Sequence, residues 1–555
     1  MDLFTQAPPQ LGNQYVDDVF LRAFLRRTLP AEVLSEIEPQ LHELGELAGG
    51  ELYALQLADR LNEPRLVQWD AWGNRIDEVV VTAVWRRAAS LAAQHGLVAI
   101  PYEQRHGAYS RLHQFAAVYL FHPSTDLYSC PLAMSDGAVR TLLSSGNAGL
   151  IERALPRLKS RDPTVAWTSG QWMTEATGGS DVGIARTTAI AQAQGDWHLY
   201  GKKWFTSAIT SQMALTLARP QGNGPGGSNL ALFYLETRDA DGKLNGIRVE
   251  RLKDKLGTRK VPTAELLLDG ARAHAVAGIR DGTRSIAPML ITTRTWNSIS
   301  AVSYMRRGLA LASSYAAQRI AFGAPLASLP LHQVTLATLE AQTRAAFLLA
   351  FELVRLVGLE ESGGANEDQR ALLRLITPVA KLLTAKQCVA VLSEVVEAFG
   401  GAGYVEDTGI PMLLRDAQVL PIWEGTTNVL ALDALLRSNV AAGLEAMQRR
   451  VSECLRQVDP ALTSAAQQVN ETLRDAAAWS KDAAPDTRSY QAGARRFVMN
   501  IGRALQLALM IEHAHWAMRD HNDRSSVAAA RIFASGPWES LAAPSWSDAT
   551  AVLNS

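Results

Sequence analysis

The chain has 555 residues, of which 47% are hydrophobic and 20% charged, a balance that excludes disordered and collagen-like chains. Its 54 Lys and Arg residues nearly equal its 55 Asp and Glu residues, and the net charge of -1 excludes a global attraction to polyanions. The cysteines Cys130, Cys388 and Cys454 lie far apart with no C-x-x-C pair. We therefore expect reduced thiols in apolar surroundings rather than disulfides or a zinc site.

The first residues, Met1-Asp2-Leu3-Phe4, show no basic region followed by an apolar run, so no secretory signal is expected. No uncharged apolar run reaches the roughly eighteen residues of a membrane-spanning helix. We therefore expect a cytoplasmic protein with no membrane partner.

Helices are predicted before residue 163. Residues 1–50 mix Pro, Gly, acids and short apolar patches, and we expect them to form an N-terminal extension. Apolar residues recur three and four positions apart over residues 50–104, and again over residues 111–156 with breaks at Pro123 and Pro131. Residues 51–163 are predicted to form a helical N-terminal domain.

The periodicity changes near Asp162-Pro163. Short segments rich in β-branched and aromatic residues then alternate with turn residues, which predicts an antiparallel β-domain over residues 164–281. The predicted strands span residues 167–173, 197–207, 213–218, 230–235, 247–252 and 264–268.

Helices resume after this domain. The helical periodicity covers residues 298–321, 333–358, 368–399 and 427–444, which predicts a helical bundle over residues 282–440. An Ala-rich stretch follows and predicts an extra helical C-terminal domain over residues 441–555. The fold class is therefore α+β with several domains, because a parallel α/β sheet requires alternating strands and helices.

Two motifs of other protein classes do not fit their surroundings. Gly222-x-Gly224-x-x-Gly227 matches a dinucleotide-binding fingerprint, but Pro225 lies inside it and a predicted strand follows it, so a hairpin loop is expected. His513 and His515 are two positions apart and point to different sides of a helix. No metal site is expected.

Two segments of the β-domain combine unusual residues. Residues 173–182 (MTEATGGSDV) follow a strand and offer hydroxyls beside two glycines, which allow a ligand to approach the backbone. The alternative is an ordinary turn. Residues 201–207 (GKKWFTS) place aromatic side chains on a strand, where they could stack against a flat ring. The alternative is a half-buried face of the sheet.

The third segment contains a carboxylate. In residues 421–429 (PIWEGTTNV), Glu424 lies between an apolar run and the start of a helix. Desolvation beside Ile422 and Trp423 would make this carboxylate a stronger base. The alternative is a capping role at the helix that begins near Thr427.

Together and in this order, the segments resemble the acyl-CoA dehydrogenase flavoprotein family over residues 50–440. The N-terminal part, residues 251–257 (RLKDKLG), Trp423-Glu424-Gly425 and the C-terminal helices resemble its AidB branch, the alkylation-response flavoproteins, over nearly the whole chain. The resemblance implies a helical N-terminal domain, a central β-domain and a helical C-terminal domain with FAD between them.

The resemblance also implies roles for single residues. Glu424 corresponds to the base that takes the α proton of an acyl-CoA while FAD takes a β hydride. Arg319 and Phe322 correspond to residues that reach the FAD of a neighbouring subunit, which implies a homotetramer. The cofactor contacts it implies are Met173, Thr174, Gly179, Ser180, Phe205, Thr206, Ser207, Arg319, Phe322, Gln333, Gly400, Gly401, Ile422, Trp423, Gly425, Thr426 and Asn428.

Three positions depart from the family pattern. Trp172 and Ile184 replace small residues, and Met412 replaces a basic one, which predicts an altered acyl channel.

The AidB branch offers an alternative function, a DNA-associated protective flavoprotein with little dehydrogenase turnover. Residues 440–555 hold twelve basic and twelve acidic residues, so a basic excess typical of DNA binding is absent. A weak DNA association through Arg449-Arg450, Arg495-Arg496 and Arg503 stays open as an expectation.

Overall fold

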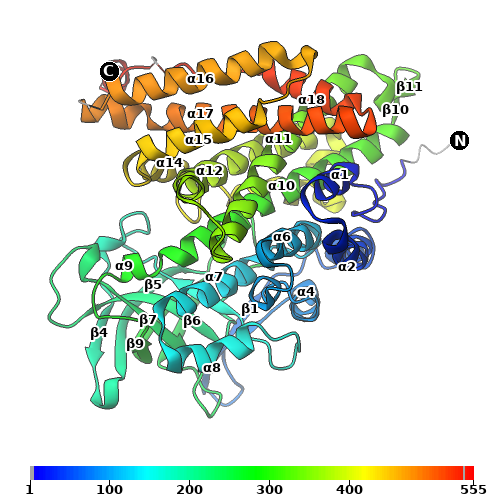
Figure 1. Cartoon of the computed structure of the whole chain (residues 1–555). Helices are drawn as coiled ribbons and strands as arrows, with labels where there is room; N and C mark the ends of the chain where they lie inside the picture. Colours follow the sequence, from blue (N-terminus) through cyan, green and yellow to red (C-terminus); the bar gives the residue numbers. More distant parts are fainter. Residues whose placement is uncertain (1–5, 485, 542–543, 555) are drawn as a thin grey trace, which may run out of the picture. The chain divides into compact units, whose positions relative to one another are not determined.

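The computed structural model describes residues 6–484, 486–541 and 544–554 (Figure 1). Residues 1–4, from which the lack of a secretory signal was predicted, lie outside this part. The chain divides into two compact units. We call residues 1–50, 106–120 and 297–555 the helical unit, and residues 51–105 and 121–296 the sheet unit.

The helical unit is built from long helices and one very short hairpin. Its elements are α1 (Val19–Thr28), α2 (Ala31–Gly49), α6 (Ser110–Phe121), most of α10 (Ala287–Gln318), β10 (Ile320–Ala321), β11 (Ala324–Pro325), α11 (Pro330–Glu361), α12 (Glu367–Ala398), α13 (Ile410–Ala417), α14 (Thr427–Leu436), α15 (Val440–Cys454), α16 (Thr463–Asp482), α17 (Thr487–His521), α18 (Arg524–Ala534) and α19 (Trp546–Leu553). In Figure 1, α16, α17 and α18 lie alongside one another.

The sheet unit combines seven strands with flanking helices and a separate hairpin. Its elements are α3 (Glu51–Ala58), β1 (Arg65–Trp69), β2 (Arg75–Val80), α4 (Ala83–Gln94), α5 (Ile100–Glu103), α7 (Ser129–Ser145), α8 (Ala148–Leu158), β3 (Ser169–Trp172), β4 (Thr188–Ala191), β5 (Trp197–Thr206), β6 (Met213–Pro220), β7 (Ala231–Glu236), β8 (Ile247–Leu252), β9 (Ala264–Ala275), α9 (Gly282–Ser285) and the start of α10.

Strand pairing makes the sheet a closed circuit. The pairs run from β6 to β4, β5, β9 and β7 and return to β6, while β3 adds to β6 and β8 adds to β9. The pairs β3–β6 and β4–β6 are parallel and the others are antiparallel. The α+β class with a central β-domain is confirmed, and most of the strand pairs are antiparallel as expected. The two parallel pairs were not predicted, because turn signals pair neighbouring strands, whereas β3 and β6 are not neighbours in the chain.

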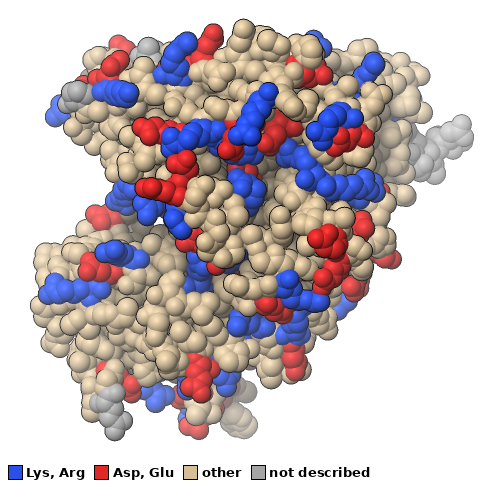
Figure 2. Space-filling view, viewed as in Figure 1, with Lys and Arg blue, Asp and Glu red and all other residues tan. Residues whose placement is uncertain are grey.

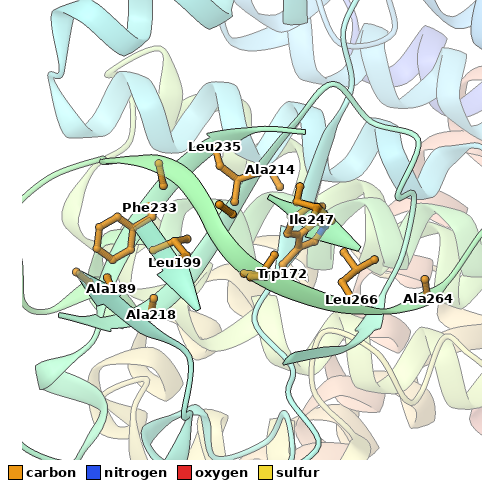
Figure 3. Packing of buried hydrophobic residues seen from close by; sticks show 14 of the residues in the cluster. Trp172, Ala189, Leu199, Ala214, Ala218, Phe233, Leu235, Ile247, Ala264 and Leu266 are labelled. Atoms are coloured by element: carbon orange, nitrogen blue, oxygen red, sulfur yellow. The ribbon is translucent and has the colours of Figure 1, made fainter. Parts of the chain in front are cut away.

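The core of the sheet unit lies within this circuit of strands. Trp172, Phe233, Leu199 and Leu266 are among the buried side chains that meet there (Figure 3). The remaining cluster members are mostly Ala, Leu, Ile and Val residues, which alternate along the strands with outward-facing positions. This rigid core fixes β3, which precedes residues 173–182, and β5, which contains most of residues 201–207.

The strands of the β-domain agree closely with the sequence, with one strand missed. The short strand β4 was not among the predicted strands. The expected helices over residues 50–104 are partly wrong, because β1 and β2 form an antiparallel hairpin there. Asp70 closes its turn by accepting bonds from Trp72 N and Asn74 N, both at 2.8 Å. That Asx turn is a local signal that the apolar periodicity hides.

The remaining motifs and side-chain clusters are described for the part of the chain that the structure covers. Residues 222–227 lie in the loop between the antiparallel strands β6 and β7. All three cysteines are buried and free, and no cluster of His, Cys, Asp and Glu among the described residues could hold a metal. One helix, α12, has the length and composition of a membrane span, but 78% of its apolar window is buried within the protein, as in a core helix.

Candidate active site

The loop after β3 is held by a buried carboxylate. Glu175 accepts hydrogen bonds from Arg186 N at 2.6 Å, Thr187 N at 3.1 Å, Thr187 Oγ1 at 2.5 Å and Lys203 Nζ at 3.0 Å. Burial would raise the pKa of Glu175, but Lys203 and these hydrogen bonds together lower it below its ordinary value. The carboxylate therefore stays ionised in the folded protein.

Lys203 ties this loop to the strand that carries the next candidate segment. Its side chain is fully buried on β5, and Nζ also donates to Leu217 O on β6 at 2.8 Å. A second link is made by Trp204 N, which donates to Thr174 O at 3.0 Å. The structure thereby brings Met173 and Thr174 beside residues 204–207, which the sequence had treated as separate motifs.

The rest of the loop is open and rich in glycine. Gly178 has φ +129, a conformation that other residues rarely adopt, and a Cβ at Gly179 would lie 2.6 Å from Thr174 Oγ1. Ser180 is exposed, whereas Thr177 Oγ1 is buried without a hydrogen-bond partner among the described residues. The loop therefore presents hydroxyls beside a backbone that a ligand can approach.

The end of β5 presents an aromatic surface. Phe205 is 57% exposed, and the register of the β5–β9 pair shifts between Lys203 and Thr206. Thr206 Oγ1 is buried and has no partner within the described structure, while Ser207 Oγ lies 3.3 Å from Thr263 Oγ1. The ammonium of Lys253 lies 3.5 Å from the centre of the Trp204 ring, a cation–π contact that sequence reasoning missed.

The acid turn, residues 421–426, lies in the helical unit between α13 and α14. Glu424 has φ +56 and Gly425 has φ +104, so two consecutive residues adopt left-handed backbone conformations. Trp423 Nε1 donates to Asn297 Oδ1, and Lys381 Nζ donates to Gly425 O at 2.7 Å. The turn is thus anchored on both sides of Glu424.

The capping alternative for Glu424 does not describe this turn. The N-cap of α14 is Thr426, and its side chain makes no capping bond. Ile422, Thr426 and Asn428 are exposed around the turn. The Thr426 hydroxyl and the Asn428 amide are thus accessible to a ligand.

Arg319, Phe322 and Gln333 come together at the connection between α10 and α11. Arg319 O accepts from Leu326 N at 2.9 Å, and Gln333 Nε2 donates to Ala327 O at 2.8 Å, which closes the connection around the β10–β11 hairpin. Phe322 at its tip has φ +52 and is 96% exposed.

Gly400 and Gly401 lie close to the end of α10. Phe399, directly before them, packs against Tyr315 with ring centres 4.6 Å apart. Gly400 has φ +59, and a Cβ on either glycine would meet no atom within 4 Å. Open space beside both glycines agrees with a turn that a ligand could approach.

Comparisons with known proteins cover nearly the whole chain. Family models match residues 6–163 as "Adaptive response protein AidB N-terminal domain", 170–271 as "Acyl-CoA dehydrogenase, middle domain", 280–438 as "Acyl-CoA dehydrogenase, C-terminal domain" and 442–539 as "Acyl-CoA dehydrogenase 11 C-terminal domain-like". Acyl-CoA dehydrogenase family member 11 of Caenorhabditis elegans is 44% identical over 92% of this chain and 86% of the worm protein. The chain belongs to the acyl-CoA dehydrogenase family.

One further relative and one solved structure give this acyl-CoA dehydrogenase its closer context. The AidB protein of Escherichia coli (strain K12) is 32% identical over 72% of each chain. The crystal structure of Caenorhabditis elegans ACDH-11 in complex with C11-CoA matches with a TM-score of 0.94 and 41% identity, over 99% of this chain and 94% of that one. This acyl-CoA dehydrogenase is therefore an AidB-like flavoprotein oxidoreductase.

The family uses FAD, and the residues present fit that cofactor. A Bacillus anthracis acyl-CoA dehydrogenase complexed with FAD shares the fold, with a TM-score of 0.72 and 20% identity over 95% of this chain and 90% of that one. In the acyl-CoA dehydrogenase described here, the buried hydroxyls of Thr177 and Thr206 lack partners in the described residues. Together with the open glycine loop and exposed Phe205, they offer what a flavin ring and its polar edge require.

The altered acyl channel predicted from Trp172 is not supported by its position. Trp172 points into the core of the sheet unit, where its side chain is 2% exposed, so its bulk cannot narrow a channel outside that core (Figure 3). Ile184 is exposed and Met412 is partly exposed. Alternation along β3 explains the difference, since Trp172 and Met173 face opposite sides of the strand.

The arginines considered for DNA contact are largely engaged within the protein. Arg449 bonds Asp368 at 2.7 Å, and Arg450 bonds both Glu352 and Glu512 at 2.9 Å. Arg503 lies over the ring of Phe533 at 4.1 Å, and burial lowers its pKa to about 10. On the face shown in Figure 2, basic and acidic side chains are interspersed.

Proposed function

We propose that this protein desaturates an acyl-CoA thioester between its α and β carbons, with Glu424 as the base. The observation that carries the proposal is the acid turn. A carboxylate on a left-handed residue, with hydrogen bonds holding the residue on either side, is presented in a defined direction. Such preorganisation is what proton abstraction from carbon requires.

The reaction breaks two C–H bonds and forms one C=C bond. The α proton passes to a carboxylate oxygen of Glu424, and the electron pair left behind forms the double bond as a hydride leaves the β carbon. Bound FAD supplies the acceptor for that hydride, because no side chain can accept one. The glycine loop (residues 173–181) and the end of β5 (residues 204–207) would hold the flavin through the Thr174, Ser180 and Ser207 hydroxyls and the Phe205 ring.

The substrate is tested with flavin absorbance as the readout. The purified, flavin-loaded protein is mixed anaerobically with acyl-CoAs of graded length, beginning with C11-CoA because the ACDH-11 complex contains it. We expect bleaching by at least one of them. Glu424→Gln should keep the flavin and slow bleaching by about 100-fold or more, since general-base catalysis contributes ~10²–10⁴-fold.

The matched control is Glu445→Gln, which removes one exposed carboxylate from α15 and should leave bleaching unchanged. Equal bleaching rates for Glu424→Gln and wild type would overturn the role of Glu424. An absence of bleaching with every chain length would overturn the reaction.

We also propose that the protein assembles as a homotetramer. The connection surface, formed by Ile320, Phe322, Leu331 and Val334, places four exposed apolar side chains on the hairpin after α10 and the first turns of α11. Contiguous exposed apolar side chains mark association surfaces in soluble proteins. The same stretch contains Arg319 and Gln333, for which the family resemblance implies contacts with FAD. A DNA-binding role has no comparable support, because Arg449 and Arg450 of α15 are ion-paired and Arg503 of α17 packs on Phe533.

A further inference from the structure

Trp423, the residue before the proposed base, is held by a buried amide. Asn297 on α10 is 3% exposed, and its Oδ1 accepts the indole N–H of Trp423. The indole nitrogen can only donate, so this bond fixes which atom of the amide faces it. Asn297 Nδ2 has no hydrogen-bond partner among the described residues. Burying a donor without a partner costs free energy, so packing alone would not favour an amide at this position.

The residue after the base is held from another helix. Lys381 on α12 is fully buried, and Nζ donates to Gly425 O at 2.7 Å. The backbone of Trp423 is fixed as well, because its N–H donates to Val419 O at 3.1 Å. The backbone is therefore held on both sides of Glu424.

The strained backbone at Glu424 requires such anchors. A left-handed conformation is unfavourable for a residue other than glycine, such as Glu424 with φ +56, and it persists only where the surroundings enforce it. The bond between Trp423 and Asn297 joins residues 126 positions apart and holds the indole directly against α10. Without this hydrogen bond, the turn could relax and change the orientation of the Glu424 carboxylate.

We infer that Asn297 is a positioning residue, which orients the Glu424 carboxylate for proton abstraction by fixing the indole of Trp423. The inference rests on the proposed function and adds to it a residue outside the motif. A displacement of about 1 Å in a reacting group can slow a reaction by 10²-fold. Lys381 holds the other side of the same turn.

The test measures proton abstraction apart from hydride transfer. A 3-thia-acyl-CoA has sulfur in place of its β carbon and cannot lose a hydride, so exchange of its α hydrogens in D₂O reports the base alone. Mass spectrometry follows the exchange, with the rate without protein subtracted. Asn297→Leu removes the acceptor at similar volume, and we expect about 10–100-fold slower exchange. The analogue's Kd, the flavin content and the melting temperature should change little.

Three further variants make the result decisive. Asn297→Asp keeps an acceptor oxygen and should restore exchange to within about threefold of wild type. Trp423→Phe removes the donor and should slow exchange as Asn297→Leu does, with no additional loss in the double variant, because both remove one bond. The inference would be overturned if the losses of exchange rate in the two single variants multiplied in the double variant. It would also be overturned if the exchange rate of Asn297→Leu were within twofold of wild type. Wild-type exchange by Glu424→Gln would instead overturn the proposed function.

If Asn297→Leu fails to fold, Trp423→Phe and Asn297→Asp decide alone. Slow exchange by Trp423→Phe with near-normal exchange by Asn297→Asp supports the inference. Normal exchange by Trp423→Phe contradicts it.

Discussion

At the scale of single residues, the buried pair of Glu175 and Lys203 has the largest structural consequence. It joins the glycine loop to β5 and so determines where Thr174 lies relative to Phe205. Leu199, Gly201 and Lys203 occupy alternate positions on β5, and Leu199 is fully buried. Strand alternation therefore predicts that Lys203, and not Lys202, faces inward.

Replacing Lys203 by Met should destabilise the protein by about 3–5 kcal/mol at neutral pH, because it leaves an uncompensated buried carboxylate. The pKa of Glu175 is lowered in the folded protein, so the pair stabilises above the ordinary carboxyl pKa of 4.5 and this stabilisation is lost as the pH falls. The destabilisation by Lys203→Met should therefore shrink in acid, where the carboxyl is protonated in the variant.

Denaturant unfolding at several pH values measures this effect. Lys202→Met, which changes an exposed neighbour on the same strand, should shift the free energy of unfolding by no more than about 0.5 kcal/mol. Glu175→Gln added to Lys203→Met should recover part of the loss. If Lys203→Met had the same denaturant midpoint as the wild-type protein, the ion pair would not be stabilising.

At the scale of elements, Gly358 shows why a helix boundary was misplaced. The sequence predicted a helix ending at Gly358, but α11 continues to Glu361. A Cβ at Gly358 would lie 2.2 Å from Ala108 O, so the glycine serves close packing of the chain segment before α6. Arg111 and Glu361 form a bidentate ion pair beside this contact, at 2.7 and 2.9 Å.

Gly358→Ala should lower the free energy of unfolding by about 1–3 kcal/mol, because the new methyl group meets backbone and cannot be avoided by rotating a side chain. The shift of the urea midpoint measures it. Gly149→Ala is the control, since this exposed glycine of α8 has only Asn147 Oδ1 nearby, at 3.8 Å. Its alanine variant should be neutral or slightly more stable through helix propensity. A neutral Gly358→Ala would show that the segment before α6 can move.

At the scale of the whole molecule, the connection surface predicts self-association. Phe322→Ser should convert the assembled protein wholly or partly to smaller species, because the most exposed apolar side chain of that surface is removed. Light scattering coupled to size-exclusion chromatography measures the mass. Leu553→Ser, which changes a leucine of α19 that is 84% exposed, serves as the control and should leave the mass unchanged. A wild-type protein of monomer mass would contradict the homotetramer.

The sequence alone determined the family, the fold class, most strands of the β-domain and the residues of the candidate motifs. Those features depend on residues that are adjacent in the sequence: turn signals between strands, hydroxyls beside glycines, and a carboxylate before a helix. Local chemistry suffices to recognise them, which is why residues 173–182, 201–207 and 421–429 could be chosen from the sequence.

Only the tertiary structure decided which partners hold those motifs. It placed the Trp172 side chain in the core of the sheet unit. It also paired Glu175 with Lys203, 28 positions along the chain, and bonded Asn297 to Trp423, 126 positions along the chain. It also made β3 and β6 parallel neighbours. Such contacts depend on how distant segments pack, and the free energy of packing is shared among many side chains, so no local pattern in the sequence encodes them.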